Sequence, residues 1–349
     1  MKQDKKQPLL DIQGLSVRFD TDDGSFKAVD DVTFSIDRGE SVGLVGESGC
    51  GKSVTALALT RLIPSPPGYI DAGRVFFNGE DLLGLKSQRL RRIRGAEISM
   101  IFQEPLSALS PLHRIGRQMV EGIRFHRNIS KKEARAYART WLSRVGIPDV
   151  AERMHAYPFQ LSGGMQQRIM IAMALMLSPS LVIADEPTTA LDVTTQAQIF
   201  SLIREMKQND TSLLLITHDM GVVWEMCDRV AVMYASRIVE TGSLNDIFFK
   251  PAHPYTIGLL GAIPRLSVQK AHLNSIPGQV PSPYGYPEGC HFQDRCTHVM
   301  DICRKNKPAL CEIAGGHFAA CFLHGDNISA CNGKPHLPDQ GQERNEAEI

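Results

Sequence analysis

A glycine-rich loop near the amino terminus has the composition and spacing of a phosphate-binding site. It reads Gly46-Glu47-Ser48-Gly49-Cys50-Gly51-Lys52-Ser53 and lies between an apolar run at 41–45 and a helix-forming stretch at 54–62. Glycines let successive backbone N–H groups turn toward phosphates, and the start of a helix adds the positive end of its dipole. We expect Lys52 to reach the β- and γ-phosphates and Ser53 to ligate Mg²⁺.

A pair of acidic residues, Asp185 and Glu186, ends the short apolar run 181–184. Such a run is typical of a buried parallel strand with charge at its carboxyl end. Together with the glycine loop, Asp185 is placed to hold Mg²⁺, and Glu186 is placed to orient or deprotonate the attacking water. Alone, either acid is more typical of a solvated strand end.

A third motif precedes the apolar helix predicted at 169–177 and comprises Leu161, Ser162, Gly163, Gly164, Met165 and Gln166. By itself, Ser-Gly-Gly is typical of a helix cap whose serine accepts backbone N–H bonds. In this order, however, Leu-Ser-Gly-Gly-x-Gln resembles the signature of the ATP-binding cassette (ABC) family. The resemblance implies that the signature of one subunit contacts the γ-phosphate held by the glycine loop of another, so that ATP lies between two cassettes.

Three further residues match that family in order. Gln103 follows the apolar run 98–102, and the resemblance implies that it senses Mg²⁺ and the attacking water. His218 follows the predicted strand 213–217 and resembles the switch histidine that hydrogen-bonds the γ-phosphate. Asp192, in Ala190-Leu191-Asp192, resembles the residue that crosses the dimer interface. Each of these alone is more typical of a surface or capping residue.

The adenine of ATP is expected to stack on an aromatic ring upstream of the glycine loop, because base stacking on a flat side chain contributes about 1–3 kcal/mol. Phe19 ends the alternating run 15–19 and is the first candidate. Phe26 is the second, and a role for Phe19 in the core of a strand remains open.

The composition excludes several classes of protein. The 349 residues include 38 basic and 38 acidic side chains, so no global charge favours nucleic acid or anionic lipid. No apolar run approaches the roughly 20 residues that span a bilayer, and no apolar core follows the charged amino terminus. We expect no nucleic-acid partner, and a peripheral location on the cytoplasmic face of the inner membrane through other subunits.

Apolar strand-like runs alternate with helical ones, which predicts an α/β fold with a mainly parallel sheet. Residues 1–250 are assigned to the nucleotide-binding domain, with a helical subdomain at about 116–165 that includes a helix at 131–145. Residues 251–349 form a carboxyl-terminal extension, with an irregular stretch at 276–289 rich in Pro, Gly and Tyr. In the ABC family the lobe and the Gln103 loop receive a short helix of a membrane subunit, so segment 104–112 is a candidate contact surface.

Six of the eight cysteines lie in the last sixty residues, at positions Cys290, Cys296, Cys303, Cys311, Cys321 and Cys331. A cytoplasmic chain is not expected to rely on disulfides, so clustered thiols favour a metal or redox site. Intervals of five, six and seventeen residues among Cys290, Cys296, Cys303 and Cys321 do not match the paired C-x2-C of a zinc ribbon.

The cysteine spacing does resemble the tail of the peptide-uptake branch of the ABC family, where four cysteines hold a 4Fe-4S cluster. Four thiolates are the usual ligands of such a cluster. Cys311 could replace one of the four, and unligated thiols or zinc remain alternatives. Mixed ligation is open because four histidines lie nearby, at positions His291, His298, His317 and His324.

The resemblance covers roughly residues 9–325 and implies an ATPase subunit that powers import of dipeptides or oligopeptides. Its implied partners are a second, related ATPase chain, two transmembrane permeases and an extracytoplasmic peptide-binding protein. Two alternatives remain at this point. The cargo could be nickel or another small solute, or the chain could be a soluble ABC ATPase without a transport role, although such proteins generally carry two cassettes or strongly basic surfaces.

Overall fold

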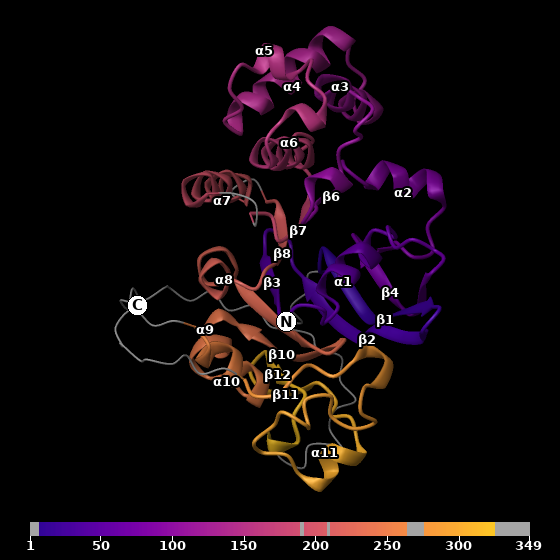
Figure 1. Cartoon of the computed structure of the whole chain (residues 1–349), viewed down its shortest axis with the longest axis vertical. Coiled ribbons are helices and arrows are strands. Elements are labelled where there is room, and N and C mark those ends of the chain that lie inside the picture. The colour runs from indigo at the N-terminus through magenta and orange to yellow at the C-terminus, as the bar shows by residue number, and fades with distance from the viewer. Residues whose placement is uncertain (1–6, 189–191, 208–209, 264–275, 325–349) are drawn as a thin grey trace, which may run out of the picture.

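The structure is a computed structural model that describes residues 7–188, 192–207, 210–263 and 276–324 (Figure 1). Its centre is an eight-stranded sheet. In spatial order the strands are β11 (Cys311–Ala314), β12 (His317–Ala319), β10 (Arg237–Ser243), β9 (Arg229–Tyr234), β3 (Ser41–Val45), β8 (Ser212–Ile216), β7 (Leu181–Asp185) and β6 (Ile98–Ile101).

The strands from β9 to β6 in this order are parallel, as expected. Strands β3, β7 and β8 are buried along their whole length, because other elements cover both faces of the parallel sheet. On β7, Val182 contributes to the hydrophobic core on one side, whereas Leu181 and Ile183 contribute to the core on the other. The parallel centre of the sheet therefore separates two apolar layers.

A second, antiparallel sheet lies beside the first and was not anticipated from the sequence. Its strands are β2 (Gly24–Ile36), β1 (Leu10–Thr21), β4 (Gly68–Phe77) and β5 (Glu80–Asp81). It packs against the central sheet and α1 (Lys52–Leu59) through a shared apolar core. The fold is therefore α/β with a parallel core, to which antiparallel strands are added on both sides.

A helical lobe projects from one end of the molecule (Figure 1). It comprises α3 (Ile115–His126), α4 (Lys131–Arg144), α5 (Val150–Arg153) and α6 (Gly163–Leu175). Helix α4 begins at a capping box, in which Ser130 and Glu133 bond each other's backbone N–H. Trp141 and Leu142 on α4 are buried in the apolar core that the helices of the lobe share. The helices of this lobe lie between residues 115 and 175.

The remaining helices connect and cover these layers. They are α2 (Ser87–Ile93), α7 (Val193–Lys207), α8 (Met220–Met226), α9 (Leu244–Phe249), α10 (Pro254–Gly261) and α11 (Asp301–Lys305), with 3-10 turns at Pro105–Ser107, Pro158–Gln160, Pro283–Gly285 and Phe322–His324. Among the described residues, no helix combines the length and apolar character that crossing a membrane requires.

The carboxyl-terminal extension continues the central sheet past the predicted boundary near residue 250. Glu240 of β10 pairs with Ala319 of β12, and Thr241 pairs with Phe318. Apart from β11 and β12, the described part of the extension consists of short helices and irregular segments, and it occupies the end of the molecule opposite the helical lobe (Figure 1). The extension is thus joined to the cassette through backbone hydrogen bonds.

Candidate active site

The glycine loop connects β3 to α1 and passes very close to two neighbouring strands. Gly46 has φ +153°, and a Cβ there would lie 2.0 Å from the carbonyl oxygen of Met233 on β9. Gly51 has φ +109°, and a Cβ there would lie 2.2 Å from the carbonyl oxygen of Ala28 on β2. These two positions require glycine for both conformation and space.

Lys52 is the first residue of α1, and its side chain turns back into the loop. Its ammonium donates to the carbonyl oxygens of Gly46 at 2.7 Å and Glu47 at 2.9 Å, and the residue is only 7% exposed. A cation held inside a loop of backbone N–H groups at a helix start is suited to bind the phosphates of a nucleotide.

Asp185 and Ser53 fit a magnesium ion. Asp185 is buried, and its Oδ1 atom has no hydrogen-bond partner among the described residues. Burial raises the pKa of Asp185, while a hydrogen bond from Ser53 and the charge of Lys52 act in the opposite direction. A buried oxygen without a partner is costly unless a ligand satisfies it. A hard cation bound by carboxylate and hydroxyl oxygens would satisfy it.

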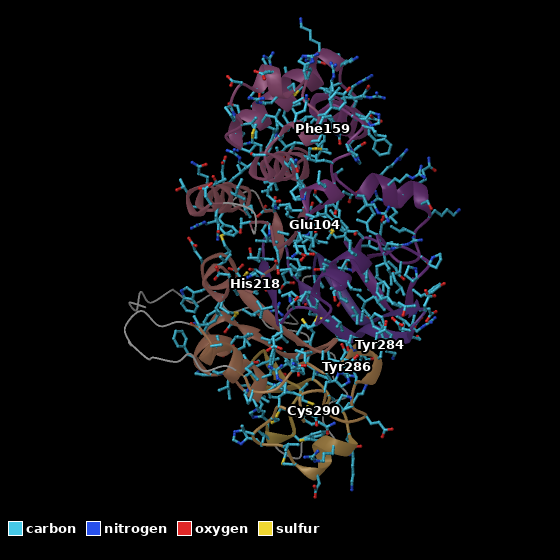
Figure 2. All side chains as sticks on the ribbon, viewed as in Figure 1. Glu104, Phe159, His218, Tyr284, Tyr286 and Cys290 are labelled. Carbon is cyan, nitrogen blue, oxygen red and sulfur yellow. The ribbon has the colours of Figure 1, made fainter. Side chains whose placement is uncertain are left out.

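Glu186 forms the centre of a polar group drawn from three loops. Its Oε2 accepts from Nε2 of Gln103 at 3.1 Å, and its Oε1 lies 3.1 Å from Nδ1 of His218. These residues follow β6, β7 and β8, which are adjacent and parallel, so their carboxyl ends meet at one edge. Glu186 is 16% exposed and His218 is 68% exposed, so the glutamate has solvent beside it (His218 is labelled in Figure 2). The structure therefore brings Gln103, Glu186 and His218 together.

Phe19 and Phe26 face each other across the β1–β2 hairpin. Their ring centroids are 5.7 Å apart and the rings are nearly parallel. Tyr284 of the extension meets Phe26 edge-on at 4.9 Å, and its hydroxyl lies 2.9 Å from Thr21 Oγ1 (Figure 2). Both phenylalanines remain candidates for adenine stacking. The sequence did not single out Tyr284, because it joins this aromatic group from a distant segment.

The signature residues cap α6. Ser162 Oγ accepts from the backbone N–H of Met165 at 3.4 Å, and Ser162 and Gly163 are exposed. Gln166 donates to the carbonyl oxygens of Pro158 and Leu161. In the described parts of the chain, no hydrogen bond joins the signature to the phosphate loop of the same chain. The signature is therefore displayed toward solvent.

Asp192 also occupies a capping position. It accepts from the backbone N–H of Thr195 at 3.0 Å and from its hydroxyl at 2.7 Å, at the start of α7. Ala190 and Leu191 lie outside the described residues. Gln167, which the sequence did not indicate, is fully buried on α6 and donates to the Pro187 carbonyl oxygen at 2.7 Å. It thus ties the helix that follows the signature to the segment beside Glu186.

The four cysteines chosen from the sequence line one pocket. Cys290, Cys296, Cys303 and Cys321 all border it. Burial raises the pKa of Cys290 to about 11; a hydrogen bond from the backbone of Phe292 acts in the opposite direction, and the charges of the other three thiolates add smaller increases. Cys311 on β11 is not among the lining residues and is disulfide-bonded, contrary to the expectation of reduced thiols.

The prediction of an iron–sulfur cluster or zinc ion at the cysteines is not confirmed. Within the described ranges, no group of three or more Cys, His, Asp or Glu side chains is placed to hold a single metal ion. Of the four histidines considered, only His298 borders the cysteine pocket. The other three form hydrogen bonds elsewhere. His291 bonds the carbonyl oxygen of Ala235, His317 bonds the carboxylate of Glu240, and His324 bonds the carbonyl oxygen of Ala252. Cys331 lies outside the described residues.

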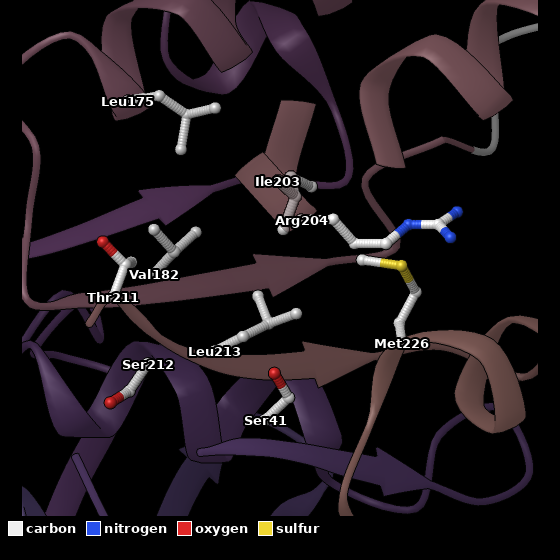
Figure 3. Close-up of a pocket in the computed structure, with 9 residues that line it drawn as sticks. All are labelled: Ser41, Leu175, Val182, Ile203, Arg204, Thr211, Ser212, Leu213 and Met226. Atoms are coloured by element: carbon white, nitrogen blue, oxygen red, sulfur yellow. The ribbon is translucent and has the colours of Figure 1, made fainter. Parts of the chain in front are cut away.

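A separate small pocket lies at the opposite edge of the sheet (Figure 3). Ser41, Val182 and Leu213, at the amino ends of three parallel strands, line it together with Met226 of α8. Its lining is mostly apolar side chains. It is therefore not part of the nucleotide site, which lies at the carboxyl ends of the same strands.

A glycine-rich loop, a buried aspartate suited to bind magnesium and a glutamate with solvent beside it fit a nucleoside triphosphatase, and the exposed Ser162-Gly163 signature fits the ATP-binding cassette class. Residues 29–189 match the family model for ABC transporters, and residues 239–303 match that for the oligopeptide/dipeptide transporter C-terminal region. The chain belongs to the ABC transporter ATP-binding proteins of the oligopeptide/dipeptide family, and it is an ATPase.

Individual relatives agree with this assignment. The oligopeptide transport ATP-binding protein OppD of Escherichia coli is 47% identical over 92% of this chain and 95% of its own length. The dipeptide transport ATP-binding protein DppD of Bacillus subtilis is 48% identical over 91% of this chain and 95% of its own. A dimeric post-hydrolysis structure of the cassette MJ0796 bound to ADP and Pi superposes with a TM-score of 0.61 at 26% identity, covering 67% of this chain and 98% of that one.

Proposed function

We propose that this chain is the ATP-hydrolysing subunit that powers uptake of dipeptides or oligopeptides across the cytoplasmic membrane. The observation that carries the proposal is the high identity, over more than nine-tenths of the chain, to ATP-binding proteins of oligopeptide and dipeptide transport. The convergence of Gln103, Glu186 and His218 beside the phosphate loop supports an active enzyme. Transport of nickel or another small solute is a less supported alternative.

The proposed roles follow from the geometry. The loop N–H groups and Lys52 bind the phosphates, and Ser53 and Asp185 would hold Mg²⁺, which when bound neutralises charge on the phosphates. Glu186 orients the attacking water and takes its proton. Gln103 and His218 hold the glutamate at its two carboxylate oxygens. The nucleophile thus reaches the γ-phosphate only when all three loops are in place.

A second cassette is needed to complete each ATP site. The support is that Ser162 and Gly163 are exposed and make no contact with the phosphate loop of their own chain, and that the solved cassette MJ0796 is dimeric. We assign Asp192 to the same interface. The partner would be a related but different ATPase chain. ATP would close the pair and hydrolysis would reopen it.

We propose that the permease binds between the helical lobe and the Gln103 loop. Leu106 and Leu112 in segment 104–112 are 58% and 81% exposed, and Phe159 of the lobe is 70% exposed. In Figure 2, Glu104 lies between the lobe that carries Phe159 and the position of His218. Exposed apolar side chains beside the catalytic loops are suited to bind a short helix of one permease subunit. This contact would keep the chain peripheral at the cytoplasmic face of the membrane.

This function can be tested by isolating the tagged chain in mild detergent and identifying the proteins that accompany it. We expect two polytopic membrane proteins and a second cassette chain, and an ATPase rate that rises when peptide-loaded binding protein is added. Ribosomal or DNA-repair partners without a membrane protein would contradict the transport role and leave the ATPase assignment intact. Stimulation by a nickel-loaded binding protein, but not by a peptide-loaded one, would assign the alternative cargo.

The four thiols at one pocket support a 4Fe-4S cluster. A zinc ion lies about 2.3 Å from each sulfur and needs a compact ligand set. No such compact set occurs in the described residues, so the proposal depends on the number of thiols at the pocket, which equals the four that such a cluster takes. Held there, the cluster would join three separate parts of the extension, around Cys290 and Cys296, at Cys303 on α11, and at Cys321.

The cluster can be tested on anaerobically purified protein. We expect about four irons and four acid-labile sulfides per chain, a loss of most of this iron in Cys321→Ser, and its retention in the matched control Cys311→Ser. Zinc without sulfide would instead assign the alternative metal. Iron content that is equal in both variants would remove Cys321 from the ligand set.

A further inference from the structure

Arg295 of the carboxyl-terminal extension forms an ion pair with Glu47 of the phosphate loop. Nη1 of Arg295 donates to Oε2 of Glu47 at 2.7 Å, and Nη2 donates to Oε1 at 3.1 Å. The Arg295 side chain is 6% exposed and that of Glu47 is 26% exposed, so this bidentate pair is largely shielded from water. Glu47 is the second residue of the phosphate loop, next to the glycine that approaches β9.

Arg295 is itself held rigidly. Its Nε donates to the carbonyl oxygen of Pro277 at 3.0 Å, and its Nη2 donates to that of Ile276 at 3.3 Å. Its guanidinium lies over the ring of Tyr234 at 5.7 Å. A planar fork with fixed neighbours imposes one geometry on the carboxylate that it binds. The position of Glu47 is therefore set by the extension.

A second contact from the same segment reaches the loop indirectly. Nδ1 of His291 bonds the carbonyl oxygen of Ala235 at 2.7 Å, in the tight turn between β9 and β10. The next residue in that turn, Ser236, donates its backbone N–H to the carbonyl oxygen of Cys50 in the phosphate loop at 3.0 Å. Segment 290–296 thus supports the loop at both Glu47 and Cys50.

The backbone of the loop is bound from the same side. The hydroxyl of Tyr255, on α10, accepts from the Glu47 N–H at 2.9 Å. Tyr255 packs against Tyr234, whose ring lies under Arg295. The Glu47 main chain and side chain are therefore both fixed by residues beyond β9.

We propose that segment 290–296 is a clamp on the phosphate loop, in which Arg295 is a positioning residue that sets the affinity of the site for MgATP. The inference builds on the proposed ATPase chemistry but does not depend on the cargo. Arg295 neutralises a carboxylate that would otherwise face the anionic triphosphate, and it holds the loop in its binding conformation. Because the loop binds the phosphates before and during hydrolysis, loss of the clamp weakens both states alike.

The clamp is bounded by Cys290 and Cys296, two of the four thiols that line the cysteine pocket. Arg295 directly precedes Cys296, so we expect a change in how this thiol is held to shift the Arg295 backbone and weaken the contact of its guanidinium with Glu47. The state of the thiol centre is thereby linked to the phosphate loop through one residue. This gives the extension a role at the ATP site in addition to any structural role.

The test compares Arg295→Gln with Arg229→Gln. Arg229 is the matched control because it forms an ion pair with Glu40 at 2.9 Å, with 14% and 12% of the two side chains exposed, at the other edge of the sheet. For Arg295→Gln we expect the Kd for MgATP of the full chain, and the KM of the assembled importer, to rise about tenfold, with kcat within twofold of wild type. A KM change with kcat unchanged is the mark of lost uniform binding. Arg229→Gln should lower the melting temperature and leave KM unchanged.

A double-mutant cycle with Glu47→Gln separates the pair from general effects. We expect Arg295→Gln to cost much less affinity in the Glu47→Gln background, because the unpaired carboxylate is gone. If Arg295→Gln does not fold, Arg295→Lys retains the charge without the fork and should raise the Kd about threefold. An unchanged Kd in the folded variant, or a fall in kcat and melting temperature with KM unchanged, would overturn the positioning role.

The link to the thiols is tested separately. Cys296→Ser should raise the Kd for MgATP in the same direction as Arg295→Gln, whereas Cys311→Ser should not. Normal MgATP affinity in Cys296→Ser protein would restrict the clamp to the Arg295–Glu47 pair and refute its coupling to the thiol centre. The Kd measurements on the full chain require neither transport nor an assembled importer, so their failure is distinguishable from failure of the proposed function.

Discussion

Replacing Glu186 by glutamine is the most direct test of the catalytic geometry. Glutamine has nearly the same shape as glutamate but cannot act as a base at neutral pH. Its amide oxygen can still accept from Gln103, and its amide nitrogen can donate to a suitable tautomer of His218, so the polar group keeps its arrangement. We therefore expect the loss to fall on kcat and MgATP binding to stay within twofold of wild type.

The expected fall in kcat follows from the general base catalysis that Glu186 supplies. General base catalysis contributes about 10²–10⁴ in rate, which corresponds to about 3–5 kcal/mol of the barrier. Glu186 is 16% exposed and bonded at both carboxylate oxygens, so in the variant a bulk water molecule cannot easily take over its role as the base. We expect at least a hundredfold fall in kcat at the half-site that contains this residue.

The assay must isolate that half-site. Phosphate release is measured in the assembled importer, with the equivalent glutamate of the partner ATPase already replaced, and nucleotide binding is measured on the same sample. Glu225→Gln is the matched control, since Glu225 is an exposed glutamate paired with Arg204 on the protein surface. A kcat for Glu186→Gln within fivefold of wild type would refute the assignment of Glu186 as base.

Three other predictions follow from single features. Asp185→Asn should raise the Mg²⁺ concentration for half-maximal activity at least tenfold, because the amide is a weaker ligand for a hard cation; an unchanged magnesium titration would contradict this. Gly51→Ala should abolish nucleotide binding, measured by equilibrium titration, because its Cβ would lie 2.2 Å from the Ala28 carbonyl oxygen. Burial acts to raise the pKa of Asp30, but the hydrogen bond from Lys27 and two further cations lower it to about 2. Its stabilisation is present above its ordinary pKa of 3.8 and is lost as pH falls through about 2, so melting temperatures over this window should fall less steeply in Asp30→Asn.

The catalytic residues could be predicted from the sequence because each follows an apolar strand. Gln103, Glu186 and His218 are far apart in the chain, but each comes directly after a strand of the parallel sheet. In such a sheet the carboxyl ends of all strands lie at one edge, so the strand order brings their loops together. The local patterns were therefore sufficient to find the residues, although only the structure gives the contacts between them.

The contacts of the extension could not be found in the same way. Arg295 and Glu47 are 248 residues apart, and neither stands in a pattern that indicates the other. Tyr284 likewise lies within a stretch whose prolines and glycines predict only irregular backbone. The antiparallel sheet was missed for a related reason, since β1 and β4 pair across the intervening phosphate loop and its helix. Pairing between distant segments depends on tertiary packing, which local propensity does not encode.

The sheet itself provides the route by which the extension reaches the nucleotide site. Strand β12 pairs with β10, β10 pairs with β9, and the Met233 carbonyl oxygen of β9 lies against Gly46 of the phosphate loop. Glu240, fully buried on β10, accepts from the N–H groups of Ala252 and His253 and from His317, which fixes the start of the extension and strand β12 to this strand. A segment joined by backbone pairing and buried charge moves with the sheet. The Arg295–Glu47 pair therefore joins the phosphate loop to a segment that the sheet already holds in place, so the proposed coupling to Cys296 needs only a local shift of Arg295 and no movement of the whole extension.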